Sequence, residues 1–165
     1  MRKTQLIITK DRMNKLVIYK GLLALSILMN VGLVYKFFLQ GEDVKNSKDG
    51  RSEIKMSSQN REFVMAEMRL FLESIKTINE GLVENNPTKI VSIDQQSGVC
   101  KVDVVPQGLI KSLPVGFKTM GMQTHDYFDK IAKIAKENYS QKEIQKELNS
   151  LMNNCVACHR TYKIT

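Results

Sequence analysis

A single uncharged stretch near the N-terminus limits most strongly what this chain can fold into. The residues from Gly21 to Tyr35 include no Asp, Glu, Lys or Arg and show no polar face. As a helix they would measure about 22 Å, and extension to Leu39 gives about 30 Å, the thickness of the hydrocarbon core of a bilayer. The lysines that flank the stretch can reach the headgroups. We therefore expect a transmembrane helix over residues 16–39.

Positive charge gathers ahead of this stretch. The first 50 residues hold nine Lys or Arg against four Asp or Glu, so they supply most of the net charge of +8. The positive-inside rule then leaves a basic tail, residues 1–15, in the cytoplasm and exports the rest of the chain. The exported residues have no Lys- and Arg-rich stripe interleaved with aromatics, and the chain has no Trp. Binding of nucleic acid is therefore not expected.

Two other interpretations of the apolar stretch are weaker. A cleaved signal peptide would have a similar apolar region, but "FFLQGEDVKNSKDG" offers no small-x-small cleavage site and the basic flank is long. A buried helix of a soluble domain is disfavoured because no polar face is visible. We favour an uncleaved signal anchor that crosses the membrane once.

The exported part begins with a polar linker and continues with helical patterns. Residues 40–54 are polar and without periodicity, as is typical of a linker. The first helix of the domain follows and ends where Asn85, Asn86 and Pro87 interrupt it. Its apolar positions step by four and three residues: Val64, Met68, Phe71, Ile75, Ile78 and Leu82.

Three further helical segments complete the predicted domain. Residues 87–123 mix β-branched residues with Gly and Pro, which predicts a broken second helix or, alternatively, a short strand pair. A third helix is expected over about 124–138. A fourth opens at Ser140, which with Glu143 makes a capping box. We expect an all-α protein with an antiparallel four-helix bundle over residues 55–165.

The last helix carries Cys155, Cys158 and His159 in the pattern C-x-x-C-H, close to the end of the chain. Positions i and i+3 lie on one face of a helix and i+4 lies beside them, so both thiols and the imidazole point at one object. Haem fits this arrangement, because the two sulfurs can bond to its vinyl groups while the imidazole binds the iron. We therefore expect one covalently attached haem c.

Three other uses of the motif explain it less well. A thioredoxin-like pair normally lies at the start of a helix, where the dipole lowers a thiol pKa, whereas this pair lies in the last turns. A structural zinc would need a fourth ligand, which only Cys100 or His125 could supply, at an unusual spacing. A plain disulfide between Cys155 and Cys158 leaves His159 unexplained. We assign no role to Cys100.

The stretch "CVACHRTYK" on the last helix resembles the closing pattern of the class II c-type cytochromes, the cytochrome c-prime and low-spin c-556-like family. The resemblance covers about residues 55–165 and implies a four-helix bundle with one haem. It extends to the first helix of the domain, where family members carry an Arg and, four residues later, a side chain over the distal haem face. The matching positions are Arg61, Met65, Cys155, Cys158, His159 and Tyr162.

The resemblance also implies roles for these residues. Arg61 would pair with a haem propionate, and Tyr162 would pack on the haem edge or form a hydrogen bond near it. Met65 would be the second axial ligand of the iron beside His159, which gives a low-spin iron of raised potential suited to electron transfer. Other side chains able to reach this position are Met56, Met68, Met120, Met122 and His125.

The expected function is that of a membrane-anchored periplasmic c-type cytochrome, a one-electron carrier in the bacterial inner membrane. Its partners would be redox proteins in or at the membrane, with a homodimer left open. The alternative is a five-coordinate haem protein that binds small gases such as NO or CO. No nucleophile–base constellation or Gly-rich phosphate loop is evident, so we do not expect an enzyme.

Overall fold

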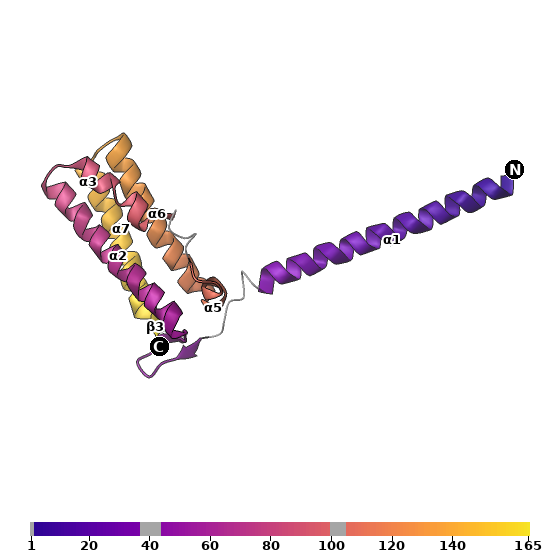
Figure 1. The fold of residues 1–165 in the computed structure, drawn as a ribbon, viewed down its shortest axis with the longest axis horizontal. Helices are drawn as coiled ribbons and strands as arrows, with labels where there is room; N and C mark the ends of the chain where they lie inside the picture. The colour runs from indigo at the N-terminus through magenta and orange to yellow at the C-terminus, as the bar shows by residue number, and fades with distance from the viewer. Residues whose placement is uncertain (1, 37–43, 100–104) are drawn as a thin grey trace. The chain divides into compact units, whose positions relative to one another are not determined.

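The computed structural model describes residues 2–36, 44–99 and 105–165 of the chain. The chain is mostly helical and divides into two compact units, residues 1–40 and 41–165. Figure 1 shows the first unit as one helix and the second as a packed group of helices with a small sheet. The mostly helical fold expected from the sequence is thereby confirmed.

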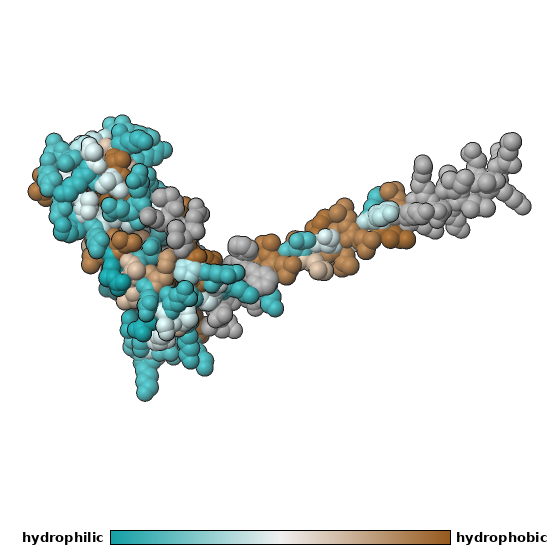
Figure 2. Space-filling model, viewed as in Figure 1, coloured by the Kyte–Doolittle hydropathy of each residue, from teal (hydrophilic) through white to brown (hydrophobic). Residues whose placement is uncertain are grey.

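The N-terminal unit contains helix α1, Arg2–Val34. Its segment Leu16–Val34 is long and apolar enough to cross a membrane or to serve as a signal sequence. Its side chains from Leu16 onward are exposed and appear as the brown surface of this helix in Figure 2. The predicted apolar helix is therefore present, while residues 37–39, the end of the predicted span, lie outside the described residues.

Helix α2, Ser58–Val83, is the first helix of the second unit, and it follows the predicted pattern. The side chain of Ser57 caps its start by accepting a hydrogen bond from the Asn60 N–H at 3.3 Å. The helix ends just before the predicted stop, where Asn85 adopts a positive φ of 52°. All six predicted stripe positions are buried or pack against buried residues. The stripe of α2 therefore faces the core.

The described parts of the segment after α2, residues 84–99 and 105–114, are broken, as predicted, and form three short helices. These are α3, Pro87–Val91, α4, Asp94–Ser97, and α5, Leu109–Ser112. Residues 87–99 and 105–123 contain no strand in the structure, so the alternative of a strand pair is not supported there. Cys100 lies outside the described residues.

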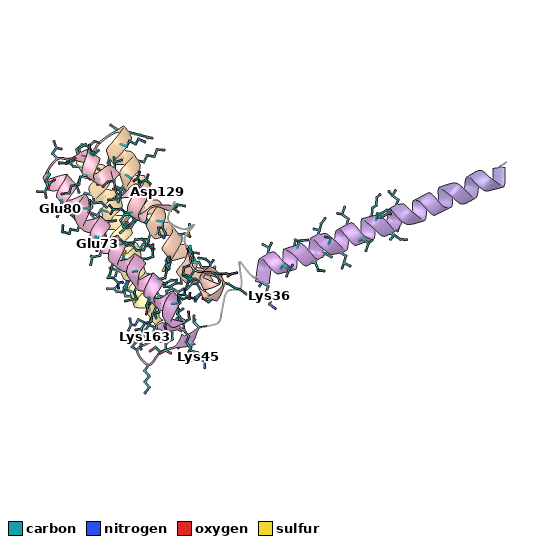
Figure 3. The ribbon with its side chains drawn as sticks, in the orientation of Figure 1. Lys36, Lys45, Glu73, Glu80, Asp129 and Lys163 are labelled. Carbon is teal, nitrogen blue, oxygen red and sulfur yellow. The ribbon has the colours of Figure 1, made fainter. Side chains whose placement is uncertain are left out.

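Helix α4 is fixed to the long helices by polar contacts at its C-terminal end. The hydroxyl groups of Ser74 and Ser97 form a buried hydrogen bond of 2.8 Å. One residue past Gly98, the Val99 N–H donates to the carboxylate of Asp129 at 3.1 Å. Figure 3 labels Asp129 on α6. These bonds position α4 between α2 and α6.

Helix α6, Val115–Glu137, begins nine residues before the predicted start at Thr124. The sequence analysis was wrong at this boundary because two glycines, Gly116 and Gly121, lower the helix propensity of its first turns. Tertiary packing overrides that propensity, and Pro114 stands at the N-cap position, where a missing N–H costs nothing. Its apolar stripe lies in the core, since four of its members are buried: Phe128, Ile131, Ala132 and Ala135.

Helix α7, Gln141–Thr161, follows after a short turn and packs extensively on α6. The predicted cap is present at its start, where the Ser140 hydroxyl accepts a hydrogen bond from the Glu143 N–H at 3.4 Å. Its buried residues Ile144, Leu148 and Leu151 form an apolar stripe that leads toward the C-x-x-C-H motif. Figure 1 shows α2, α6 and α7 as the long helices of the unit.

A three-stranded sheet corrects the expectation of an all-α domain with a polar linker over 40–54, of which residues 40–43 lie outside the described residues. Its strands are β1, Lys45–Asn46, β2, Ser52–Ile54, and β3, Tyr162–Ile164, in the order β1-β2-β3. Strands of two or three residues are too short to show a period of two in the sequence. Strand β2 pairs with β1 antiparallel and with β3 in parallel.

The pairing of β2 with β3 determines which helix ends meet. Ile54 lies opposite Ile164, and the Thr165 N–H donates to the Ile54 carbonyl at 3.0 Å. In return, the Met56 N–H donates to the Thr165 carbonyl at 3.2 Å. The C-terminal end of α7 is thereby held beside the start of α2. Lys45 and Lys163 mark this end of the unit in Figure 3.

The core consists of two clusters of buried residues. The larger one lies between α2, α3, α6 and α7 and includes Ile78, Phe128 and Leu148. The smaller one lies nearer the strands and includes Ile54, Val64 and Phe117. Cys155 packs against the larger cluster and Cys158 against the smaller. The cysteine motif therefore lies at the boundary between the two clusters.

Candidate functional site

The last turns of α7 bring the motif residues to one cavity of about 360 Å³. Cys155 and Cys158 are half-buried free thiols, and the side chain of His159 is otherwise exposed. All three line this cavity. The structure thus places two thiols and one imidazole around a single space, the arrangement that the helical spacing predicts.

The walls of the cavity are mainly apolar. They come from α2, from α5 and the residues that flank it, and from the first half of α6. Four further side chains add polar groups to the lining: Glu67, Lys118, Thr124 and His125. The principal apolar members are Phe63, Val64, Met68, Phe71, Leu109, Leu113 and Phe117. A large and mainly apolar ligand with a few polar contacts suits such a lining.

Helix α6 is locked to α7 directly before the motif. The side-chain amide of Asn154 donates to the Met120 carbonyl at 2.8 Å and to the Thr124 hydroxyl at 3.0 Å. Because Asn154 immediately precedes Cys155, these two bonds fix the register between the cavity-lining part of α6 and the thiols. A helix pair without them could slide and change the shape of the cavity.

Tyr162 closes the next turn beyond the motif. Its ring meets the ring of Phe117, a cavity wall, edge to face at a centroid distance of 5.5 Å. Its backbone N–H caps α7 by donating to the Cys158 carbonyl. Tyr162 does not itself line the cavity, so the structure places it behind the wall that Phe117 forms.

The contact of Tyr162 with α6 gives a test of this packing. A Cβ atom added to Gly116 would clash with the Tyr162 hydroxyl oxygen. We expect Gly116→Ala to lower the free energy of unfolding by about 1–3 kcal/mol, because the tyrosine ring must move from Phe117. In a Tyr162→Phe background the same substitution should cost less, since the clashing oxygen is gone. Urea unfolding of the four proteins measures this coupling, and equal costs in both backgrounds would contradict the contact.

Burial keeps the two thiols protonated at neutral pH. Desolvation raises the pKa of Cys155, and desolvation together with the neighbouring Cys155 raises the pKa of Cys158 to about 11. Thiol–disulfide exchange needs a thiolate, which such values disfavour. The structure therefore argues against a thioredoxin-like redox pair.

The zinc alternative needs a cluster of ligands around the motif, and Cys100, one possible fourth ligand, lies outside the described residues. Within residues 16–36, 44–99 and 105–165, no three His, Cys, Asp or Glu side chains cluster as metal ligands. His125, the fourth ligand considered above, instead has its own partners. Its Nδ1 atom donates to the Ser97 carbonyl at 2.8 Å, and its ring lies edge to face on Phe71 at 5.1 Å.

The structure separates Arg61 and Met65 from the cavity. Both side chains are exposed, Met65 by 42 %, and they line a different surface hollow together with Met56 and Thr165. The remaining side chains considered for the distal position all line the cavity: Met68, Met120, Met122 and His125. The family pattern on α2 therefore does not bring Arg61 and Met65 to the thiols in this structure.

Two charged cavity residues were missed by the sequence analysis. Glu67 on α2 and Lys118 on α6 both line the cavity. No motif marks either of them, because each is a single charged residue among mainly apolar neighbours in the sequence. The early start of α6, which the glycines concealed, is what brings Lys118 onto the cavity wall.

The comparisons with known proteins identify no relative. No family model matches the chain, and neither a curated protein nor a solved structure matches it.

Proposed function

We propose that this protein is a membrane-anchored c-type cytochrome that carries one haem on Cys155 and Cys158, with His159 as the proximal ligand of the iron. The carrying observation is that these three residues line one largely apolar cavity of about 360 Å³. Cavities that hold small molecules and cofactors measure about 300–1,000 Å³. The bundle would be of the four-helix kind, with α3, α4 and α5 in the place of its second helix.

The residues present fit a covalent haem. Both sulfurs are free, so each is available for a thioether bond, and the imidazole of His159 lies one residue beyond Cys158. Bound haem would supply a one-electron couple at its iron. The apolar walls would exclude water from the macrocycle, and the exposure of His159 leaves one side of the site near the surface. A site close to the surface suits electron exchange with redox partners.

The second axial ligand, in this proposal, is Met68 rather than Met65. Met68 lines the cavity, and it packs against the same core cluster as Cys158. It stands three residues after Met65, so the two share one side of α2, but only Met68 is on the inner part of that side. A soft thioether sulfur is a suitable iron ligand and raises the potential.

A second candidate function follows from the other residues of the same wall. Phe63, Val64 and Phe71 offer no ligand atom, and Val64 is only 8 % exposed. If one of them faced the iron, the sixth position would be open and the protein would bind small gases such as NO or CO. Residues 41–165 could serve either role from the periplasmic side of α1.

A matched pair of methionine variants tests the choice of ligand. Met68→Ala should convert a low-spin spectrum to a high-spin one and permit fast binding of carbon monoxide to the reduced protein. Met65→Ala is the control, and its spectrum should stay low-spin because that side chain lies in another hollow. The measurement is the visible spectrum of each full-length protein in detergent, oxidised and reduced, with and without carbon monoxide.

Other outcomes of this experiment would indicate a different second axial ligand or an open sixth position. A high-spin spectrum of Met65→Ala would indicate that Met65, the ligand implied by the family resemblance, binds the iron. This result would contradict the choice of Met68 from the cavity geometry. An unchanged Met68→Ala protein would favour His125, whose free Nε2 atom is available because Nδ1 carries the proton. Fast carbon monoxide binding by the unsubstituted protein would favour the gas-binding function.

A further inference from the structure

One positive charge in the cavity has no partner among the described residues. The Nζ atom of Lys118 is buried and forms no hydrogen bond there. Among the described residues, Glu67 is the acidic side chain that lines the same cavity, and it forms no ion pair with Lys118. A buried ammonium without an anion is strongly unfavourable, so a group of opposite charge is expected to meet it.

The position of Lys118 along α6 brings it to the level of the motif. Two residues after Lys118, the Met120 carbonyl accepts a hydrogen bond from Asn154 of α7, and two residues before it, Gly116 lies against Tyr162. Lys118 lies between these two contacts, as the cysteine pair lies between Asn154 and Tyr162 on α7. Its side chain and those of Cys155 and Cys158 then line one space.

The lining specifies the chemical class of the missing group. Most of the wall is apolar, so the ligand must be mainly apolar, and the buried ammonium requires an anionic end. We propose that Lys118 binds a carboxylate of the haem held in the cavity, an inference that rests on the function proposed above. This assigns to Lys118 the role for which the family resemblance suggests Arg61, which lies in another hollow.

Three variants of the full-length protein test this assignment. Lys118→Met keeps the length of the side chain and removes the charge, Lys118→Arg keeps the charge, and Glu67→Gln removes the competing acid. Resonance Raman spectroscopy follows the bending band of the haem carboxylates, which responds to a bound cation. We expect Lys118→Met to shift this band, while Lys118→Arg and Glu67→Gln leave it in place.

The reduction potential gives a second, independent result. A cation beside the haem disfavours ferric iron, which carries one more positive charge than ferrous iron. Loss of this cation in Lys118→Met should therefore shift the equilibrium toward ferric iron by about tenfold. For a one-electron couple this is a fall of 59 mV in midpoint potential. Lys118→Arg should stay close to the unsubstituted protein.

The contrary outcomes are distinct. An unchanged carboxylate band in Lys118→Met, with haem attached, would overturn the role of Lys118 alone. If Glu67→Gln shifts the carboxylate band as much as Lys118→Met does, Glu67 would be the partner of Lys118, and the proposed role of Lys118 would also be overturned. A chain that carries no covalent haem would overturn this inference together with the proposed function.

Discussion

Replacing both Cys155 and Cys158 with alanine should leave a denatured chain with no haem attached. Each sulfur provides one covalent link, so a chain without both retains none, however well the cavity still holds the cofactor in the folded state. The measurement is the intact mass of the full-length chain after denaturation, from cells that attach haem to exported cytochromes. The single variants should each keep a fraction of haem through the remaining thioether.

Cys100 supplies the matched control for this experiment. It is the third cysteine of the chain and stands outside the C-x-x-C-H motif. Cys100→Ala should therefore retain haem at the level of the unsubstituted protein. Haem that persists in the Cys155→Ala/Cys158→Ala double variant, or disappears in Cys100→Ala, would contradict the assignment of the attachment site.

Replacing Phe128 with alanine should strongly destabilise the second unit. Phe128 is fully buried and packs against Phe71 with their ring centroids 5.5 Å apart. Removal of such a ring leaves a cavity and costs about 3–5 kcal/mol. That is a large share of the roughly 5–15 kcal/mol that stabilises a typical domain.

Denaturant unfolding of the full-length chain in mild detergent measures this effect. Leu72→Ala is the control, because Leu72 stands next to Phe71 on α2 but is 68 % exposed. It should change the free energy of unfolding by no more than about 0.5 kcal/mol. A Phe128→Ala protein as stable as the Leu72→Ala protein would contradict the packing of α2 on α6.

The long helices could be predicted from the sequence because their signals are local. The stripe from Val64 to Leu82, the stop at Pro87 and the cap at Ser140 each depend on residues within a few turns of one another. The apolar helix at the N-terminus is equally local, since its length and lack of charge decide it. These parts agree with the structure.

The strands and the start of α6 could not be predicted, because they depend on distant residues. Strand β3 forms only because β2, about 110 positions earlier in the chain, lies beside it. Gly116 disfavours a helix by itself, yet it permits the close approach of Tyr162. Local preferences therefore failed where contacts between distant segments decide the structure.

The candidate site also contains residues that local sequence predicts and residues that only tertiary packing identifies. The spacing of Cys155, Cys158 and His159 on one helix is enough to predict that they face one object. The choice between Met65 and Met68 is not local, because the two lie on one side of α2 and only packing against the rest of the unit separates them. Lys118 became a candidate only when the cavity and its buried ammonium were seen.

The most direct test of the account is whether the purified full-length chain keeps haem through denaturing extraction. The protein would be exported in a host that matures c-type cytochromes, extracted with acidic acetone, and examined by the absorption spectrum of the reduced pyridine complex. We predict that haem stays with the polypeptide, at one per chain, and shows the band of a haem bound by two thioethers. A colourless polypeptide, with any haem in the acetone phase, would contradict the central claim.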